Sequence, residues 1–278
     1  MFDKIEKLEC GSIIQHGPYN DRIYLLKVSE RKIYSLPSRL IAIAEKNGYG
    51  KIFAKVDETQ ARSFLNNQFI VEAKISEMYP KEREGLFLAF YLKKNRKIEP
   101  DLQLYVDNLL LALDKKSSKT HWLNKIHFNL RQCTKDDIPV MIEIYKKIFP
   151  TYPFPIHDPE YLIKTMKNDV DYFCVESKGK LVALSSAEKD NSTTSAEMTD
   201  FATLPDWRGN GLAIHLLKKM EKSIKKQGFS TAFTIARSAS AGMNITFSKS
   251  GYTYGGRLIN NTNISGKIES MNVWHKKL

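Results

Sequence analysis

A short glycine-containing segment at residues 208–213 carries the clearest chemical signal in the sequence. It reads Arg208-Gly209-Asn210-Gly211-Leu212-Ala213. If a helix begins here, its first N–H groups lack internal partners, and the helix dipole favours an anion. The glycines let the backbone approach that anion closely, and Arg208 adds charge-assisted hydrogen bonds. The segment therefore predicts a site for phosphate groups, most readily a pyrophosphate.

The residues on both sides of this segment supply the elements that must position it. Residues 197–204 are expected to form a strand. After the segment, apolar residues spaced four apart predict a helix that Gly228 ends, namely Leu212, Leu216, Met220 and Ile224. A glycine-rich turn between a strand and a helix is much stronger evidence than the turn alone.

With Arg208, Gly211 and Ala213 at its fixed positions, the segment resembles the coenzyme loop of the Gcn5-related N-acetyltransferase (GNAT) family, Arg/Gln-x-x-Gly-x-Gly/Ala. The resemblance implies an α/β (α+β) fold, with a mixed central sheet flanked by helices. It also implies acetyl-CoA as co-substrate and no metal, with the backbone near Thr203 polarising the acetyl carbonyl. The residues implied to bind the coenzyme are Ala202, Thr203, Leu204, Arg208, Gly209, Asn210, Gly211, Leu212, Ala213, Asn244 and Phe247.

The family often carries its general base early in the coenzyme strand, where this sequence has Glu197. A lysine-type amine has a pKa of ~10.4 and is protonated near neutral pH, so a base must remove a proton. The alternative for Glu197 is an exposed carboxylate at a strand edge. Asp200 and Glu188 are the reserves, and could instead bind a cationic substrate.

The family's usual proton donor to the leaving thiolate is a tyrosine, and here Phe247 takes its place. Phe247 cannot donate a proton, so it is expected to pack in the core or against the coenzyme. Water, Ser248 or Tyr252 could serve as the acid.

Segments spread over nearly the whole chain resemble the β-lysine N-acetyltransferases. They are residues 11–17, 151–159, 197–213, 237–244 and 260–274. This resemblance implies direct transfer of acetyl, in a ternary complex, to the ε-amino group of β-lysine. The product, Nε-acetyl-β-lysine, is a compatible solute, and β-lysine comes from lysine 2,3-aminomutase. A different amine or a protein lysine remains an alternative acceptor, and a non-catalytic acyl-CoA-binding module is an alternative class.

An acceptor with two amines and a carboxylate requires acidic groups at one end of its site and donors at the other. His157 and Asp158 stand in a loop with three prolines, which either walls this site or merely packs. Asp158, Glu188 and Asp200 could meet the retained amine. Arg237, Asn260 or Asn261 could hold the carboxylate, although the asparagines also suit a turn.

The chain is expected to comprise an N-terminal α/β domain at 1–118, a linker at 119–125 and a catalytic domain at 126–278. The strand–helix–strand pattern of residues 48–73 parallels that of residues 228–257. We therefore expect the N-terminal domain to be a degenerate GNAT-like half without a coenzyme loop. It would cover the acceptor site or support a homodimer. His16 and Arg22 could reach that site, or could simply flank a turn.

The composition excludes several other classes of protein. The net charge of +12 is spread over both halves without a basic module, which argues against nucleic-acid binding. No apolar run is long enough to span a membrane, and the charged N-terminus is unlike a secretory signal. Three widely spaced cysteines, Cys10, Cys133 and Cys174, suit a reducing compartment. We expect a cytoplasmic protein.

Overall fold

The computed structural model describes residues 3–29, 33–115 and 127–278. Among these residues, the N-terminal half contains six strands and three α-helices. The elements are β1 (Lys4–Lys7), β2 (Ile13–Gly17), β3 (Arg22–Lys27), η1 (Ile33–Ser35), α1 (Leu36–Asn47), β4 (Lys51–Asp57), α2 (Glu58–Leu65), β5 (Ile70–Tyr79), β6 (Arg83–Tyr91), η2 (Lys94–Lys97) and α3 (Leu102–Asp114).

The C-terminal half contains seven strands and four α-helices among the described residues. They are β7 (Asn129–Gln132), η3 (Lys135–Asp137), α4 (Ile138–Ile148), α5 (Pro159–Lys167), β8 (Val170–Ser177), β9 (Lys180–Lys189), β10 (Ser195–Thr203), η4 (Pro205–Trp207), α6 (Leu212–Lys226), β11 (Thr231–Arg237), α7 (Ala241–Lys249), β12 (Thr253–Ile264) and β13 (Lys267–Lys277). The predicted strand before the coenzyme loop and the helix after it are confirmed as β10 and α6. The expected linker at 119–125 lies outside the described residues.

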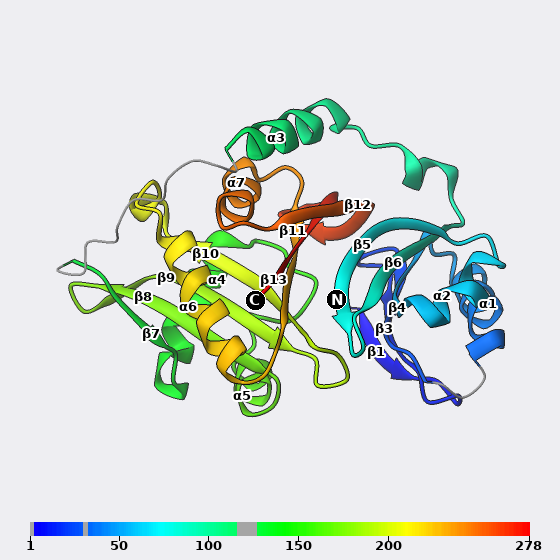
Figure 1. Cartoon of the computed structure of the whole chain (residues 1–278), viewed down its shortest axis with the longest axis horizontal. Helices are drawn as coiled ribbons and strands as arrows, with labels where there is room; N and C mark the ends of the chain where they lie inside the picture. The colour runs from blue at the N-terminus through cyan, green and yellow to red at the C-terminus, as the bar shows by residue number, and fades with distance from the viewer. Residues whose placement is uncertain (1–2, 30–32, 116–126) are drawn as a thin grey trace.

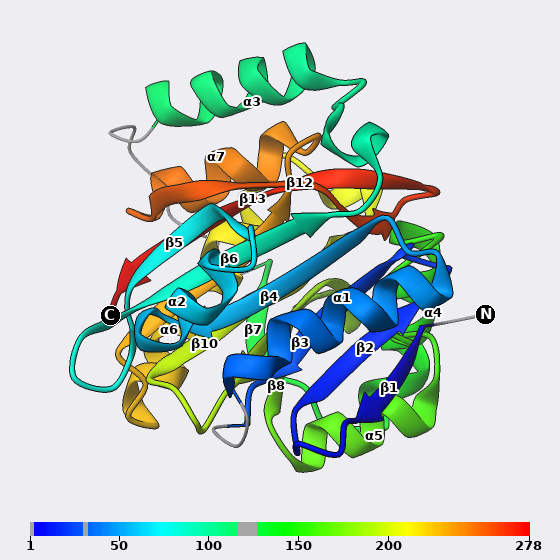
Figure 2. The same cartoon turned by 90° about the vertical axis from the view of Figure 1, so that its right-hand side faces the viewer.

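In the described part of the chain, all the strands belong to one continuous mixed sheet (Figures 1 and 2). Its order is β1-β2-β3-β4-β6-β5-β12-β13-β11-β10-β9-β8-β7. The pairs β3–β4 and β10–β11 are parallel, and the other neighbouring pairs are antiparallel. Helices α1 and α2 cover the outer face of the N-terminal strands, while α3 lies beside α7.

The two halves repeat one order of elements. The series β3-α1-β4-α2-β5-β6 has the same parallel and antiparallel pairings as β10-α6-β11-α7-β12-β13. The two series meet where β12 runs antiparallel to β5, with Gly256 opposite Ala73.

The N-terminal sheet contacts helices on one face and the C-terminal half on the other. Side chains alternate along a strand, so Ile23 and Leu25 of β3 pack in a core beneath α1 and α2. On the opposite face, Tyr24 and the neighbouring Phe53 belong to a core that includes residues of α4, β8 and β11. The C-terminal half therefore contributes to the burial of the N-terminal half. Among the described residues, no helix is both long and apolar enough to cross a membrane.

Candidate active site

The loop before α6 has the backbone conformation that its glycines predict. Gly209 and Gly211 have φ values of +84° and +68°, in the left-handed region that β-carbon-bearing residues disfavour. Two hydrogen bonds fix the loop, from Arg208 Nε to the Thr203 carbonyl (3.3 Å) and from Asn210 Nδ2 to the Trp207 carbonyl (3.1 Å). A Cβ built on either glycine would meet no atom within 4 Å, so the surface beside this helix start is open. This geometry suits a pyrophosphate.

Strands β10 and β11 are paired only over the first residues of β10. Their parallel pairing extends from Ser195–Thr231 to Glu197–Phe233 and then stops. On the other edge of β10, the pairing with β9 is irregular between Thr199 and Ala202, where Asp200 has a φ of +55°. The bulge bends β10 away from β11, and the strands open a gap that an extended ligand arm can enter.

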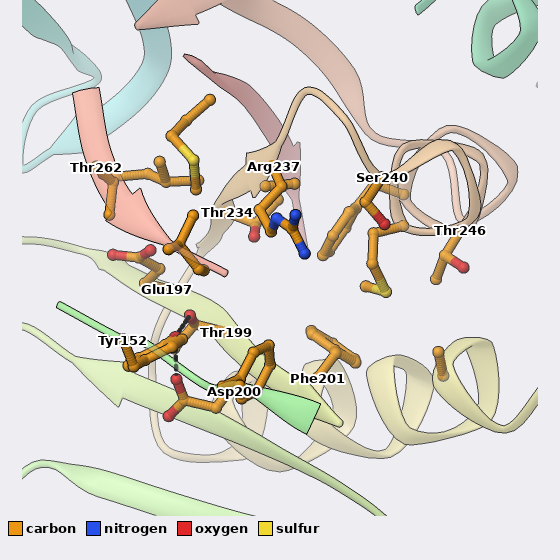
Figure 3. A pocket seen from close by; sticks show the side chains of 18 of the residues that line it. Tyr152, Glu197, Thr199, Asp200, Phe201, Thr234, Arg237, Ser240, Thr246 and Thr262 are labelled. Atoms are coloured by element: carbon orange, nitrogen blue, oxygen red, sulfur yellow. Dashed lines mark hydrogen bonds between the residues drawn. The ribbon is translucent and has the colours of Figure 1, made fainter. Parts of the chain in front are cut away.

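A cavity of about 820 Å³ extends from the coenzyme loop through this gap to the N-terminal half. Figure 3 shows Glu197, Thr199 and Phe201 of β10 on one side, and Thr234 and Arg237 of β11 on another. Loop residues between α4 and α5 also line the cavity, namely Tyr152, Pro153 and Phe154. Strands β3 and β4 form the wall on the side of the N-terminal half, through Arg22, Tyr24, Leu26, Phe53 and Lys55.

Two glutamates lie opposite each other in the cavity, because Glu197 of β10 pairs in register with Glu188 of β9. Burial raises the pKa of Glu197 to about 7, although Lys55 and a backbone hydrogen bond work against the shift. Burial and the nearby charges of Glu197 and Asp200 hold the pKa of Glu188 well above its usual range. Both shifts favour the protonated carboxyl, and Glu197, with a pKa of about 7, can accept and release a proton near neutral pH.

Asp200 also borders the cavity, but both its carboxylate oxygens already accept hydrogen bonds. Tyr152 donates to Oδ1, and Ser186 donates to Oδ2 at 2.5 Å. Burial raises the pKa of Asp200, while these donors oppose the shift. Asp200 thus fixes the aromatic loop against the bulge of β10 (Figure 3), a role that the sequence did not indicate.

Among the residues that the structure describes, five basic ones line the cavity, and three of them have carboxylate partners. Lys189 Nζ lies 2.9 Å from Asp171, and Arg208 belongs to the coenzyme loop. Lys55 Nζ lies 3.7 Å from Asp190 and above the Phe233 ring. Arg237 donates from Nε and Nη2 to Glu269 at 2.9 and 2.8 Å. Arg22 forms no ion pair with any described residue.

Many of the predicted site residues line this single cavity. They are Glu188, Glu197, Asp200, Thr203, Arg208, Gly209, Gly211, Leu212, Ala213, Arg237, Phe247 and Asn261. Ala202, Leu204 and Asn210 are chain neighbours of lining residues, although their own atoms do not line the cavity.

Four predicted site residues are placed elsewhere. Asp158 is exposed and caps α5 by accepting from the Glu160 N–H at 2.9 Å, and His157 beside it does not reach the cavity. Asn260 donates to the Arg96 and Ile98 carbonyls. Asn244 is fully buried, where it bridges Arg237 and Ser240 carbonyls to Asn272 and Trp274. Asp158, Asn244 and Asn260 thus each satisfy a structural hydrogen-bonding need, whereas His157 Nε2 is buried without a hydrogen-bond partner among the described residues.

The two side chains considered as proton donors to the thiolate are also outside the cavity, since neither Ser248 nor Tyr252 lines it. Phe247 does line it and packs edge-on against Phe201, with ring centroids 5.6 Å apart. The hydroxyls on this side come instead from Ser240 and Thr246 of the α7 region (Figure 3). Sequence reasoning also missed Tyr24, Phe53, Lys55 and Tyr152, of which the first three share one face of the paired strands β3 and β4.

Comparison with known proteins places this site in context. Residues 138–245 match the family model of the acetyltransferase (GNAT) family. The chain is 38% identical to the β-lysine N(6)-acetyltransferase of Methanococcus maripaludis, over 95% of this chain and 96% of that protein. It is 29% identical to the N-acetyltransferase YodP of Bacillus subtilis over the full length of both. A β-lysine N(6)-acetyltransferase of Methanosarcina mazei is 38% identical over 54% of this chain and 56% of its own length.

Proposed function

The chain belongs to the acetyltransferase (GNAT) family and is an acetyl-CoA-dependent N-acetyltransferase, and we propose that its acceptor is the ε-amino group of β-lysine. The observation that carries this proposal is the pair Glu188 and Glu197, at the point where a cavity beginning at the coenzyme loop meets the N-terminal half. The similarity to β-lysine N(6)-acetyltransferases over nearly the whole chain supports the same acceptor.

The residues around the loop fit acetyl-CoA. The N–H groups at the start of α6 and the side chain of Arg208 would hold the pyrophosphate, and the gap between β10 and β11 would admit the pantetheine arm. The thioester supplies an activated acetyl group. The protein supplies orientation, because it holds the two reactants in one cavity.

We assign Glu197 as the general base. Its pKa of about 7 allows the carboxylate to take a proton from the bound ammonium near neutral pH. The freed amine nitrogen then forms a bond to the acetyl carbon as the carbon–sulfur bond breaks. The nitrogen loses two protons in all. Glu197 passes one of them to solvent, and the other balances the proton that the thiolate takes up to leave as the thiol.

The transfer is proposed to be direct, within a ternary complex. The cavity is long enough to reach both the coenzyme loop and the two glutamates, and no cysteine is among the described residues that line it. A cysteine-bound acetyl intermediate therefore has no obvious carrier. The Ser240 and Thr246 hydroxyls, or water, are available to protonate the sulfur.

We further propose that the product serves as a compatible solute, and that a lysine 2,3-aminomutase supplies the substrate. The three cysteines are free thiols, which supports the reducing cytoplasm as the compartment. The repeated order of elements supports the interpretation of the N-terminal domain, proposed at 1–118, as a degenerate half of the same fold.

A panel of acceptors tests the proposed function. Release of CoA would be measured with acetyl-CoA and, in turn, β-lysine, lysine, ornithine, a linear diamine and a lysine-containing peptide. We expect β-lysine to give the highest kcat/KM. Turnover of another acceptor with no turnover of β-lysine would overturn the proposed acceptor while leaving the enzyme class intact.

A further inference from the structure

Arg22 occupies an unusual position for a buried arginine. It is the first residue of β3, is only 3% exposed, and lines the cavity from the N-terminal half. Burial lowers its pKa to about 10, so the side chain is still charged near neutral pH. A buried charge is costly unless it is paired, yet Arg22 has no carboxylate within ion-pair distance among the described residues.

The contacts that Arg22 does make fix its orientation. Nη1 donates to the Asn261 carbonyl and to Thr262 Oγ1, the latter at 3.2 Å. The guanidinium carbon lies 5.2 Å from the centre of the Tyr24 ring and 5.6 Å from that of Phe53. These hydrogen bonds use only Nη1. Nε is buried without a hydrogen-bond partner, and Nη2 also has none among the described residues. The Nε–Nη2 edge of the guanidinium therefore has no hydrogen-bond partner in the part of the chain that the structure describes.

That edge is the one with which an arginine binds a carboxylate bidentately. Arg237 demonstrates the geometry in the same cavity, because its own Nε and Nη2 are occupied by Glu269. Lys55 is likewise paired, with Asp190. Lys189 also lines the cavity and is paired with Asp171, and Arg208 lies at the coenzyme loop. Among the described residues at the acceptor end of the cavity, Arg22 is therefore the basic side chain with capacity for an anionic ligand.

We propose that Arg22 binds the carboxylate of the acceptor, so that the N-terminal half selects amino-acid substrates over simple polyamines. The inference rests on the proposed function, since it assumes an acceptor with an amine at one end and a carboxylate at the other. The amine lies between Glu188 and Glu197, and the carboxylate points towards β3 and the Asn261–Thr262 segment. The opposite charges at the two ends orient the substrate so that only one amine faces the coenzyme.

The test compares two acceptors that differ only by the carboxylate, β-lysine and its decarboxylated analogue 1,4-diaminopentane, in the full-length enzyme. For Arg22→Gln, we expect kcat/KM for β-lysine to fall about 100-fold, the effect of losing a charged hydrogen bond of about 3 kcal/mol. The value for 1,4-diaminopentane should change by less than about threefold, because that ligand makes no contact with the missing charge. Arg22→Lys, which retains charge but not the planar fork, should fall between the wild type and Arg22→Gln.

Arg96→Gln is the matched control. Arg96 is also buried and donates to the carbonyls of Asn20 and Asn260, but it is paired with Asp21 and does not line the cavity. Arg96→Gln should change kcat/KM for both acceptors by the same factor. Acetyl-CoA binding, measured by calorimetry, reports whether each variant is folded. If Arg22→Gln does not fold, Arg22→Lys tests the proposal instead, through a fall in kcat/KM for β-lysine that 1,4-diaminopentane does not show.

An equal loss for both acceptors, or no loss for β-lysine, would overturn the role of Arg22. If the wild type does not acetylate β-lysine, the proposed acceptor fails independently. The comparison is then made with whichever amino acid is turned over and its decarboxylated amine. Turnover only of amines without a carboxylate would overturn both proposals.

Discussion

Glu197 illustrates how one residue acquires its chemistry from its surroundings. Its place on β10 sets it opposite Glu188 and deep in the cavity, where burial disfavours the ionised form. Lys55, from the other half of the chain, favours the ionised form. Burial and the charge of Asp200 thus raise the pKa of the base, while Lys55 and a backbone hydrogen bond lower it.

The pH dependence of kcat/KM should follow the ionisation of Glu197. The active form is the carboxylate, so activity should rise with pH through a midpoint of about 7 and then level off until the substrate amines titrate. Glu197→Gln should lower kcat by about 10²–10⁴-fold and remove this rise. Steady-state rates from pH 5.5 to 8.5 are the measurement, and an unchanged midpoint in the glutamine variant would assign the base elsewhere.

Removing the charge of Lys55 should move that midpoint. Lys55→Met takes away the group that lowers the pKa of Glu197, so the rise should shift to higher pH. Lys74→Met is the control, because Lys74 is a largely exposed lysine paired at 3.8 Å with Glu84. A midpoint that stays in place, or moves down, in Lys55→Met would contradict the proposed interaction.

At the scale of the element, the start of α6 combines a conformational requirement with a binding role. Gly211 has φ and ψ of +68° and +18° at the N-cap of α6, while Gly48 has +68° and +27° just after α1. At either glycine, an added Cβ would meet no atom within 4 Å. The two therefore differ in location while sharing one backbone conformation.

This pair separates backbone strain from coenzyme binding. Gly211→Val and Gly48→Val should each lower the free energy of unfolding by about 1–2 kcal/mol, the cost of the left-handed conformation. Only Gly211→Val should raise the KM for acetyl-CoA, by about tenfold or more, since it also disturbs donors to the phosphates. Urea unfolding and steady-state kinetics provide the two readouts; equal KM values for the two variants would mean that the loop does not hold the coenzyme.

Local sequence patterns predict this element, but they do not predict where several individual side chains lie. The strand, the loop and the helix of residues 197–226 follow from alternation, glycine spacing and four-residue periodicity, which are all short-range. The position of Asn244 and Asn260 outside the cavity could not be predicted, because partners such as Trp274 and Arg96 lie far away in sequence. A polar residue that satisfies a distant backbone group cannot be told from a ligand-binding one by its neighbours alone.

At the scale of the whole molecule, the site exists because two similar halves meet at β5 and β12. The repeat could be inferred from the sequence, but the way in which the halves join could not. Their pairing brings Gly256 so close to β5 that an added Cβ would lie 2.2 Å from the Glu72 carbonyl oxygen and 2.6 Å from Ala73 Cα. Only that junction places Arg22, Tyr24 and Lys55 over the cavity.

Widening the junction should therefore impair acceptor binding more than coenzyme binding. Gly256→Ala should lower the free energy of unfolding by about 1–3 kcal/mol through overpacking, and should raise the KM for the acceptor while leaving that for acetyl-CoA nearly unchanged. The control is Gly266→Ala, at a turn with a φ of +90° and no atom within 4 Å of the added carbon. Equal acceptor KM values in the two variants would show that the junction does not shape the acceptor site.

The position of acetylation on β-lysine tests the central claim most directly. The enzyme would be incubated with acetyl-CoA and β-lysine, and the product analysed by NMR. We predict a new amide at the ε-nitrogen with the β-amine unmodified, because Arg22 and the two glutamates orient the substrate with its terminal amine towards the coenzyme. Acetylation at the β-amine, or no transfer at all, would contradict this account.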